Sequence, residues 1–312
     1  MKITAYIDGQ EGTTGLQIRD RLLRHPDVTL LEIHPDKRKD PTERARLMNG
    51  SDVTFLCLPD SAAKEAVPLV TNPATRIIDA STAHRTAPGW AYGFPELSPA
   101  HRAAIASGKR IANPGCHATG FIAAAYPLVA LDLCGRDYPF TCHSVTGYSG
   151  GGKKMIAQYE AAERTPDLDS PRQYGLSLAH KHLPEMQQVV GLTAPPVFNP
   201  IVADYYCGMA VSTPLMVRCM AKPVSKAALT EALTSYYAGC PLVTVSGVCE
   251  SGFLPANEKA NQPGLTLYVM GNDEQMTLVS VFDNLGKGAS GAAVQNMNIA
   301  FGLPETKSLL EA

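Results

Sequence analysis

The chain has 312 residues, eight cysteines and a formal net charge of −2. This charge leaves no extended basic field for nucleic acid or an anionic membrane, and 45% hydrophobic with 18% charged residues is typical of a globular protein. No apolar run reaches about 18 residues, the length that a membrane-spanning helix needs. The first residues have the pattern of a strand and not that of a signal peptide. We therefore expect a cytoplasmic protein, and the length favours two domains.

The first 115 residues alternate short β-rich runs with helix-like runs, as in an α/β domain whose parallel sheet is covered on both faces. The predicted strands are Lys2–Asp8, Thr29–His34, Val53–Leu58, Arg76–Ala80 and Arg110–Asn113. The predicted helices are Thr13–Arg24, Pro41–Met48, Ser61–Val70 and Pro99–Ser107.

From about residue 139 the strands become longer and fewer helices separate them, which predicts a second, α+β domain with a mostly antiparallel sheet. The predicted strands are Phe140–Gly147, Pro196–Asp204, Met209–Val217, Leu242–Val245, Leu265–Met270 and Met276–Phe282. The Pro- and Gly-containing stretch Glu250–Gly264 predicts a long loop.

A Gly-x-x-Gly-x-x-Gly loop, Gly9 to Gly15, joins the first strand to a helix. Such glycines permit a tight turn and close approach of the backbone to a pyrophosphate at the helix N-terminus, as in Rossmann-type domains; a purely structural turn is the alternative. After the second strand, Lys37, Arg38 and Lys39 suit the 2′-phosphate of NADP. A solvated basic turn would look the same, and the nearby Glu32 and Asp36 leave NAD open.

Cys116 follows Asn113-Pro-Gly and begins an apolar helix pattern. Unpaired N–H groups and the positive end of the helix dipole favour the thiolate at that position, and the thiolate is the form that attacks carbonyl carbon. The other cysteines have no comparable context and are expected to be core or surface thiols: Cys57, Cys134, Cys142, Cys207, Cys219, Cys240 and Cys249. No Cys-x-x-Cys pair is present, so no metal site is predicted.

Histidine is the usual proton partner of a catalytic cysteine, and His180 and His182 stand just before a predicted helix near Pro184. Glu185 could fix the tautomer of one of them, although a structural role for both residues is equally open. Two segments combine glycines, a hydroxyl and lysine ahead of a helix, which suits anion binding or simple capping. They are Gly147–Lys154 and Asp283–Gly291, and Asp79–Arg85 adds a cation at a strand end.

Taken in order, these motifs resemble the short-type N-acetyl-γ-glutamyl-phosphate reductases, a family related to aspartate-semialdehyde dehydrogenase. The matching segments are Gly9–Gly15, Asp79–Arg85, Asn113–Thr119, Ser149–Lys153, His180–Glu185 and Asp283–Asn298. The chain departs from many relatives at Ala83-His84, where they carry Asp-Phe, and at Thr13-Thr14, where they carry an aromatic residue. These departures concern contacts to cofactor and substrate and leave the nucleophile unchanged.

The resemblance implies a nucleotide domain of residues 1–115 and 286–312, to which a C-terminal helix at about Ala289–Phe301 returns, and a catalytic and oligomerisation domain of residues 116–285. It implies a homodimer or homotetramer that uses NADPH to reduce an acyl phosphate through a thioester on Cys116, in arginine biosynthesis. Either His182 or His180 would move the proton, with His182 favoured by its position beside Pro-Glu.

The resemblance also assigns candidate binding residues. The expected cofactor residues are Gly9, Gly12, Thr13, Thr14, Gly15, Lys37, Arg38, Ser81, Asn284, Gly286 and Lys287. The expected substrate residues are Arg85, Asn113, Ser149, Gly150 and Lys153. A reductase of aspartyl or aminoadipyl phosphate, a cysteine hydrolase or acyltransferase, and a non-catalytic dinucleotide sensor remain alternatives.

Overall fold

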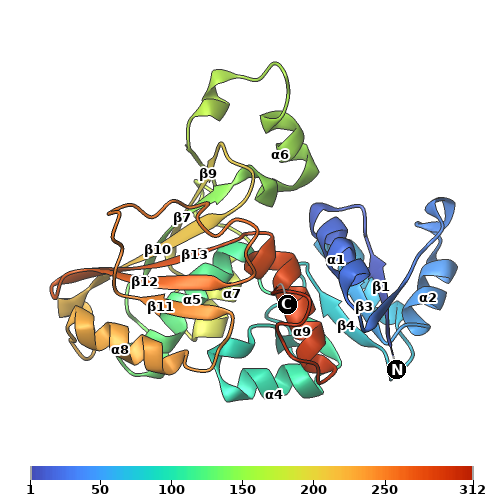
Figure 1. The fold of residues 1–312 in the computed structure, drawn as a ribbon, viewed down its shortest axis with the longest axis horizontal. Coiled ribbons are helices and arrows are strands. Elements are labelled where there is room, and N and C mark those ends of the chain that lie inside the picture. Colours follow the sequence, from blue (N-terminus) through green and yellow to red (C-terminus); the bar gives the residue numbers. More distant parts are fainter. Residues whose placement is uncertain (1, 311–312) are drawn as a thin grey trace. The chain divides into compact units, whose positions relative to one another are not determined.

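The computed structural model describes residues 2–310, which form two compact units. The first unit comprises residues up to Pro114 together with Ala289 onward, and the second comprises Gly115–Gly288. Figure 1 shows the elements of both. Within residues 2–310, no helix combines the length and apolar character needed to cross a bilayer.

The first unit contains a six-stranded parallel sheet in the order β2-β1-β3-β4-β6-β5. The strands are β1 (Ile3–Asp8), β2 (Val28–Leu31), β3 (Val53–Leu56), β4 (Arg76–Asp79), β5 (Ala91–Tyr92) and β6 (Arg110–Ala112). The helices are α1 (Thr13–Arg24), α2 (Pro41–Asn49), α3 (Asp60–Ala66), α4 (Pro99–Ser107) and the C-terminal α9 (Gly291–Ala300). This is the predicted Rossmann-type arrangement.

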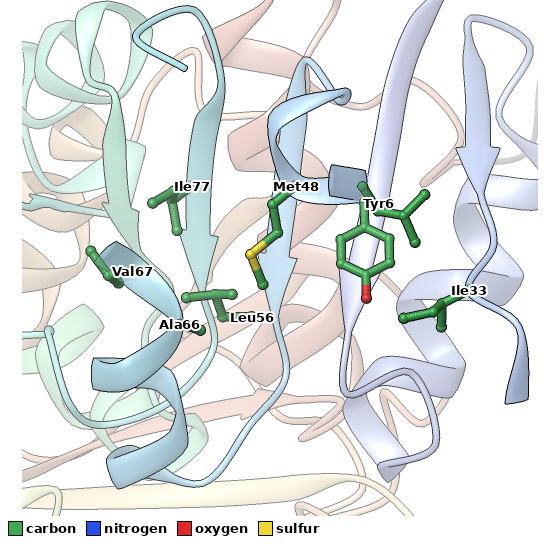
Figure 2. Packing of buried hydrophobic residues seen from close by; sticks show 8 residues of the cluster. Tyr6, Ile33, Met48, Leu56, Ala66, Val67 and Ile77 are labelled. Carbon is green, nitrogen blue, oxygen red and sulfur yellow. The ribbon is translucent and has the colours of Figure 1, made fainter. Parts of the chain in front are cut away.

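Helices cover both faces of this sheet because alternate strand residues point to opposite faces. Figure 2 shows one face, where Tyr6, Leu56 and Ile77 pack with Met48 of α2 and Ala66 of α3. Helix α9 packs against α1, α4 and β4. The C-terminal helix therefore belongs to the first unit although more than half of the chain separates it from β6.

The second predicted strand and the edge of this sheet differ from what the sequence predicts. The second strand ends at Leu31, not at His34, because His34 caps a short 3-10 turn that begins with Pro35. Proline has no N–H for a strand ladder, so the chain leaves the sheet before it. The short edge strand β5 was not predicted, since two residues carry no periodic signal.

The second unit contains a seven-stranded sheet in the order β11-β12-β13-β10-β7-β9-β8. The pairings β11–β12 and β7–β9 are parallel and the others are antiparallel, so the mostly antiparallel prediction is confirmed. The strands are β7 (Thr141–Gly147), β8 (Arg172–Gln173), β9 (Val197–Ala203), β10 (Met209–Met216), β11 (Val243–Ser246), β12 (Leu265–Gly271) and β13 (Gln275–Phe282). The helices are α5 (Cys116–Ala130), α6 (Gly152–Tyr159), α7 (Leu183–Val190) and α8 (Lys226–Tyr236).

Helix α5 is the central element of the second unit. It packs on β10, β13 and α7, and almost every residue from His117 to Leu128 is buried. Contact with the sheet is close at Gly120, where a Cβ atom would collide with Val211 of β10 and Phe282 of β13. Ser280 of β13 donates a hydrogen bond of 2.8 Å to the Gly120 carbonyl oxygen. The absence of a side chain at Gly120 therefore sets how closely α5 approaches the sheet.

We expect Gly120→Ala to destabilise the protein by about 1 to 3 kcal/mol, because an overpacked interface must shift backbone or force unfavourable rotamers. Urea unfolding followed by circular dichroism measures the change. Gly264→Ala is the matched control, since its Cβ would lie 3.5 Å from its nearest neighbour, the Leu242 oxygen. Equal stability of the two variants would show that α5 does not depend on this contact.

Candidate active site

The loop after β1 leaves backbone donors without an intrahelical acceptor at the start of α1. Gly9 has φ of +85° and Gly12 N donates to Gly9 O at 3.1 Å, which closes the turn. Gly12 caps α1 without any side-chain bond, so the N–H groups of Thr13, Thr14 and Gly15 point out of the first turn. A Cβ on Gly15 would lie 2.5 Å from Gly9 O, so only glycine fits. This geometry suits a phosphate group.

A cavity of about 300 Å³ lies beside this loop in the first unit. Its basic lining residues are Arg38, Lys39 and Arg44. Arg38 lies 3.0 Å from Glu11, and Arg44 forms a bidentate ion pair with the buried Asp8, with its shortest contact at 2.6 Å. Lys37 was predicted to contact the cofactor, but it is not among the residues that line this cavity.

Arg44 was missed by sequence reasoning because it lies on the following helix, α2, and not in the basic turn after β2. Parallel β-α-β connections bring the start of that helix back to the carboxyl edge of the sheet. A basic residue in the first turn of the second helix is therefore the sequence feature by which Arg44 could have been identified.

The segment after β4 is organised by the fully buried Asp79. Its carboxylate bonds to the Ser81 hydroxyl at 2.7 Å and to His84 Nδ1 at 2.6 Å, and the His84 ring stacks on Trp90. Arg85 donates to the backbone oxygens of Ala80 and Asn113. The predicted residues Ser81 and Arg85 thus lie at the carboxyl edge of the first sheet, where open α/β folds bind ligands.

The Asn113 side chain is buried and hydrogen-bonded at both of its polar atoms. Its side chain is 1% exposed, its Nδ2 donates to Ala289 O at 2.9 Å, and its Oδ1 accepts from Asn296 at 3.2 Å. The predicted substrate role would compete with these two bonds.

Cys116 is the first residue of α5, as the Pro-Gly turn predicts. Gly115 caps the helix without a side-chain bond, and its own N–H donates to Glu185 Oε1 at 2.8 Å. Glu185 is 2% exposed, so this carboxylate is a buried anchor for the turn that carries the thiol. The first-turn N–H groups of α5 point toward the start of the helix, where negative charge is stabilised.

His117 forms the centre of a cluster of rings, and the sequence assigned no role to it. Its Nδ1 lies 2.7 Å from Ser144 Oγ, and its Nε2 lies 2.8 Å from the Tyr174 hydroxyl. The His180 and His182 rings have centroids 5.6 and 5.5 Å from that of His117. The structure therefore brings the two predicted histidines together beside the residue that follows the nucleophile.

Burial controls protonation in this cluster. Desolvation lowers the pKa of His117 to about 3 and also lowers the pKa of His180. Burial, followed by the charge of Cys116, raises the pKa of Tyr174, which keeps the phenol protonated. Burial therefore favours the neutral imidazole of His117 over the charged one.

Further predicted residues of the second unit meet around Asn284. Its Oδ1 accepts from Gly208 N at 2.7 Å and its Nδ2 donates to Ser149 Oγ at 3.1 Å. Gly150 lies next to the same amide, while Lys153 is exposed on α6. Gly286 N donates to the Asp283 carboxylate, and Lys287, although charged, is 2% exposed.

The remaining thiols are poor nucleophiles where they are buried. Desolvation raises the pKa of Cys134 to about 12 and that of Cys207 to about 11, and raises those of Cys57 and Cys142 further. Cys219 is exposed. Across residues 2–310, no three His, Cys, Asp or Glu side chains form a set able to hold a metal ion.

We expect acid to destabilise the protein through His117. Its folded pKa lies below the ordinary value of 6.5, so the stability from the neutral ring is complete above pH 6.5 and is lost as the pH falls toward the folded value. Between pH 6.5 and about pH 5 the loss should reach about 2 kcal/mol. The free energy of unfolding, measured by urea denaturation across this pH range, should depend less on pH in His117→Gln than in the wild type. The variant His143→Gln, at an exposed histidine, should keep the wild-type pH dependence. The same pH dependence in both variants would show that His117 does not cause the loss of stability.

Comparison with known families agrees with this geometry. The family model for "Semialdehyde dehydrogenase, NAD binding domain" matches residues 5–105, and that for "Semialdehyde dehydrogenase, dimerisation domain" matches residues 116–284. Aspartate semialdehyde dehydrogenase II from Vibrio cholerae superposes with a TM-score of 0.72 at 13% identity, covering 97% of this chain and 99% of its own. Aspartate semialdehyde dehydrogenase from Candida albicans, solved with NADP, superposes with a TM-score of 0.65 at 14% identity. The match covers 96% of this chain and 98% of that one. These structures confirm the fold.

Curated relatives are much more similar in sequence. N-acetyl-gamma-glutamyl-phosphate reductase 2 from Nostoc sp. is 46% identical and covers 97% of this chain and 98% of its own. The protein of the same name from Pseudomonas putida is also 46% identical, and the match covers 95% of this chain and 96% of that protein. The chain therefore belongs to the semialdehyde dehydrogenase family, among the N-acetyl-γ-glutamyl-phosphate reductases that its motifs resemble.

Proposed function

We propose that this protein reduces N-acetyl-γ-glutamyl phosphate to N-acetylglutamate semialdehyde and releases phosphate, a step of arginine biosynthesis. The observation that carries the proposal is the position of Cys116 at the start of α5, next to a cluster of imidazoles. Relatives that are 43 to 46% identical over nearly the whole chain bear the name of this activity.

In the proposed reaction the Cys116 thiolate attacks the acyl carbon, phosphate leaves and a thioester forms. The N–H groups of the first turn of α5 stabilise negative charge at the sulfur. Arg85, Ser149, Gly150 and Lys153 are the candidates for binding the phosphate and carboxylate groups of the substrate. Their donors are of the type that recognises such anions.

His182 is the better candidate for the proton transfer. His180 Nδ1 accepts the backbone N–H of His182 at 3.2 Å, which leaves only Nε2 of His180 for a proton transfer. His182 itself is 5% exposed and occupies the N-cap position of α7, with its ring centroid 5.5 Å from that of His117. It would protonate the oxygen that becomes the aldehyde and, in the reverse direction, deprotonate the hemithioacetal. His180 is retained as the alternative.

The first unit has the features needed to hold NADP(H). The uncapped start of α1 suits the pyrophosphate, and the cavity lined by Arg38, Lys39 and Arg44 suits a 2′-phosphate. Thr13, Thr14 and Ser81, and from the second unit Asn284, Gly286 and Lys287, are further candidates. When bound, NADPH supplies the hydride that reduces the thioester.

We also propose that residues 1–115 and 286–312 serve the cofactor, while residues 116–285 serve the chemistry and the assembly of a homodimer or homotetramer. The family model over residues 116–284 is described as a dimerisation domain, which supports an oligomer. Aspartyl and aminoadipyl phosphates are the competing substrates. The solved aspartate-semialdehyde enzymes share the fold but only 13 to 16% identity, so they do not favour the first of these.

Cys116→Ser should lower kcat for phosphate-dependent oxidation of N-acetylglutamate semialdehyde by at least about a thousandfold, since the hydroxyl is a far weaker nucleophile. The measurement is nicotinamide absorbance with N-acetylglutamate, aspartate and aminoadipate semialdehydes in parallel. Cys219→Ser, at an exposed thiol, is the control. A Cys116 variant with near-wild-type rate would exclude the thioester, and turnover of only the aspartate or aminoadipate compound would overturn the substrate.

Replacing Arg38 and Lys39 together by alanine should weaken NADPH binding by about tenfold or more, with little effect on NADH, because charge-assisted bonds to the 2′-phosphate are lost. Lys37→Ala is the comparison, since Lys37 does not line the cavity. The measurement is the dissociation constant of each variant for NADPH and for NADH, by fluorescence titration. An equal effect on both dinucleotides, or a larger effect of Lys37→Ala, would place the 2′-phosphate elsewhere.

A further inference from the structure

Ser144, His117 and Tyr174 form a hydrogen-bonded chain inside the second unit. Ser144 lies on β7 and is 0% exposed, His117 lies in the first turn of α5 and is 4% exposed, and Tyr174 directly follows β8. The two links are 2.7 and 2.8 Å long. The thiolate mechanism makes no use of this chain.

The direction of the chain follows from counting protons. A buried hydroxyl needs an acceptor for its proton, and among residues 2–310 the hydrogen-bond partner of the Ser144 hydroxyl is His117 Nδ1 alone. Nδ1 must therefore accept. A neutral imidazole carries one proton, which then lies on Nε2 and is donated to the Tyr174 oxygen.

This direction has a consequence for Tyr174. Because its oxygen accepts from His117, its own O–H remains available as a donor. The charge of Cys116 acts on this phenol, and Tyr174 also lies near His180, with ring centroids 5.9 Å apart. In the opposite direction the phenol would donate to His117, and its O–H would not be available to another acceptor.

We propose that Ser144 and His117 are positioning residues that orient this chain so that the Tyr174 hydroxyl donates toward the reacting centre beside Cys116. The role in catalysis rests on the proposed function. A fixed donor of this kind stabilises the oxyanion that forms when sulfur attacks the acyl carbon, and it needs no reorganisation during the reaction. Phe198, whose ring centroid lies 5.2 Å from that of His117, packs the imidazole in place.

The tautomer of His117 tests the first part without any substrate. Protein labelled with ¹⁵N-histidine should show His117 protonated at Nε2, with the signals assigned by their loss in His117→Gln. In Ser144→Ala the Nδ1 nitrogen loses its donor, so the Nδ1–H form should become populated. A wild-type His117 protonated at Nδ1 would overturn the proposal, whether or not the protein reduces the expected acyl phosphate.

Kinetics test the second part. Ser144→Ala and Tyr174→Phe should each lower kcat by about tenfold with little change in KM, and the double variant should lose little more than either single one. Ser280→Ala is the matched control, because Ser280 is also 0% exposed and also bonds α5 from the same sheet, but at Gly120. Equal losses of kcat in the Ser144 and Ser280 variants would show that the hydrogen bonds of Ser144, His117 and Tyr174 only support the fold. Additive losses of kcat in the double variant would show the same.

Discussion

The close packing of α5 on the sheet of the second unit is the constraint on which the candidate active site depends. Gly120 permits the approach, and Ser280 and Ser144 each bond a group on the helix from the sheet below it. Interiors are packed too densely for the helix to shift without cost. Cys116 and His117 occupy the first turn of this helix, so their positions follow from how it is seated.

Polar groups of the second unit are held in place by burial as well as by hydrogen bonds. Glu185 anchors Gly115 from α7, while Asn284 connects Gly208 to Ser149. A buried polar group that loses its partner costs free energy, so each pair resists rearrangement. This rigidity keeps donors in place before the substrate arrives, which is how a protein stabilises charge that develops during a reaction.

Local sequence patterns predicted most of the fold. Helices α1 and α4 have the predicted bounds, because glycines or a Ser-Pro cap mark their starts clearly. The predicted strands of the second unit agree within a residue or so with the observed ones. The short strands β5 and β8 were not found, since two residues cannot show a period.

The sequence by itself predicted the position of Cys116 at the start of a helix, the glycine loop and the histidine doublet, because each depends on neighbours within a few residues of the chain. It could not determine the partners of these groups. Arg44 reaches Asp8, and His117 reaches Ser144 and Tyr174, across separations of 36, 27 and 57 residues. Only tertiary packing brings such residues together. It therefore decided which basic residues line the cavity, and that His117, to which the sequence assigned no role, lies at the centre of the imidazole cluster.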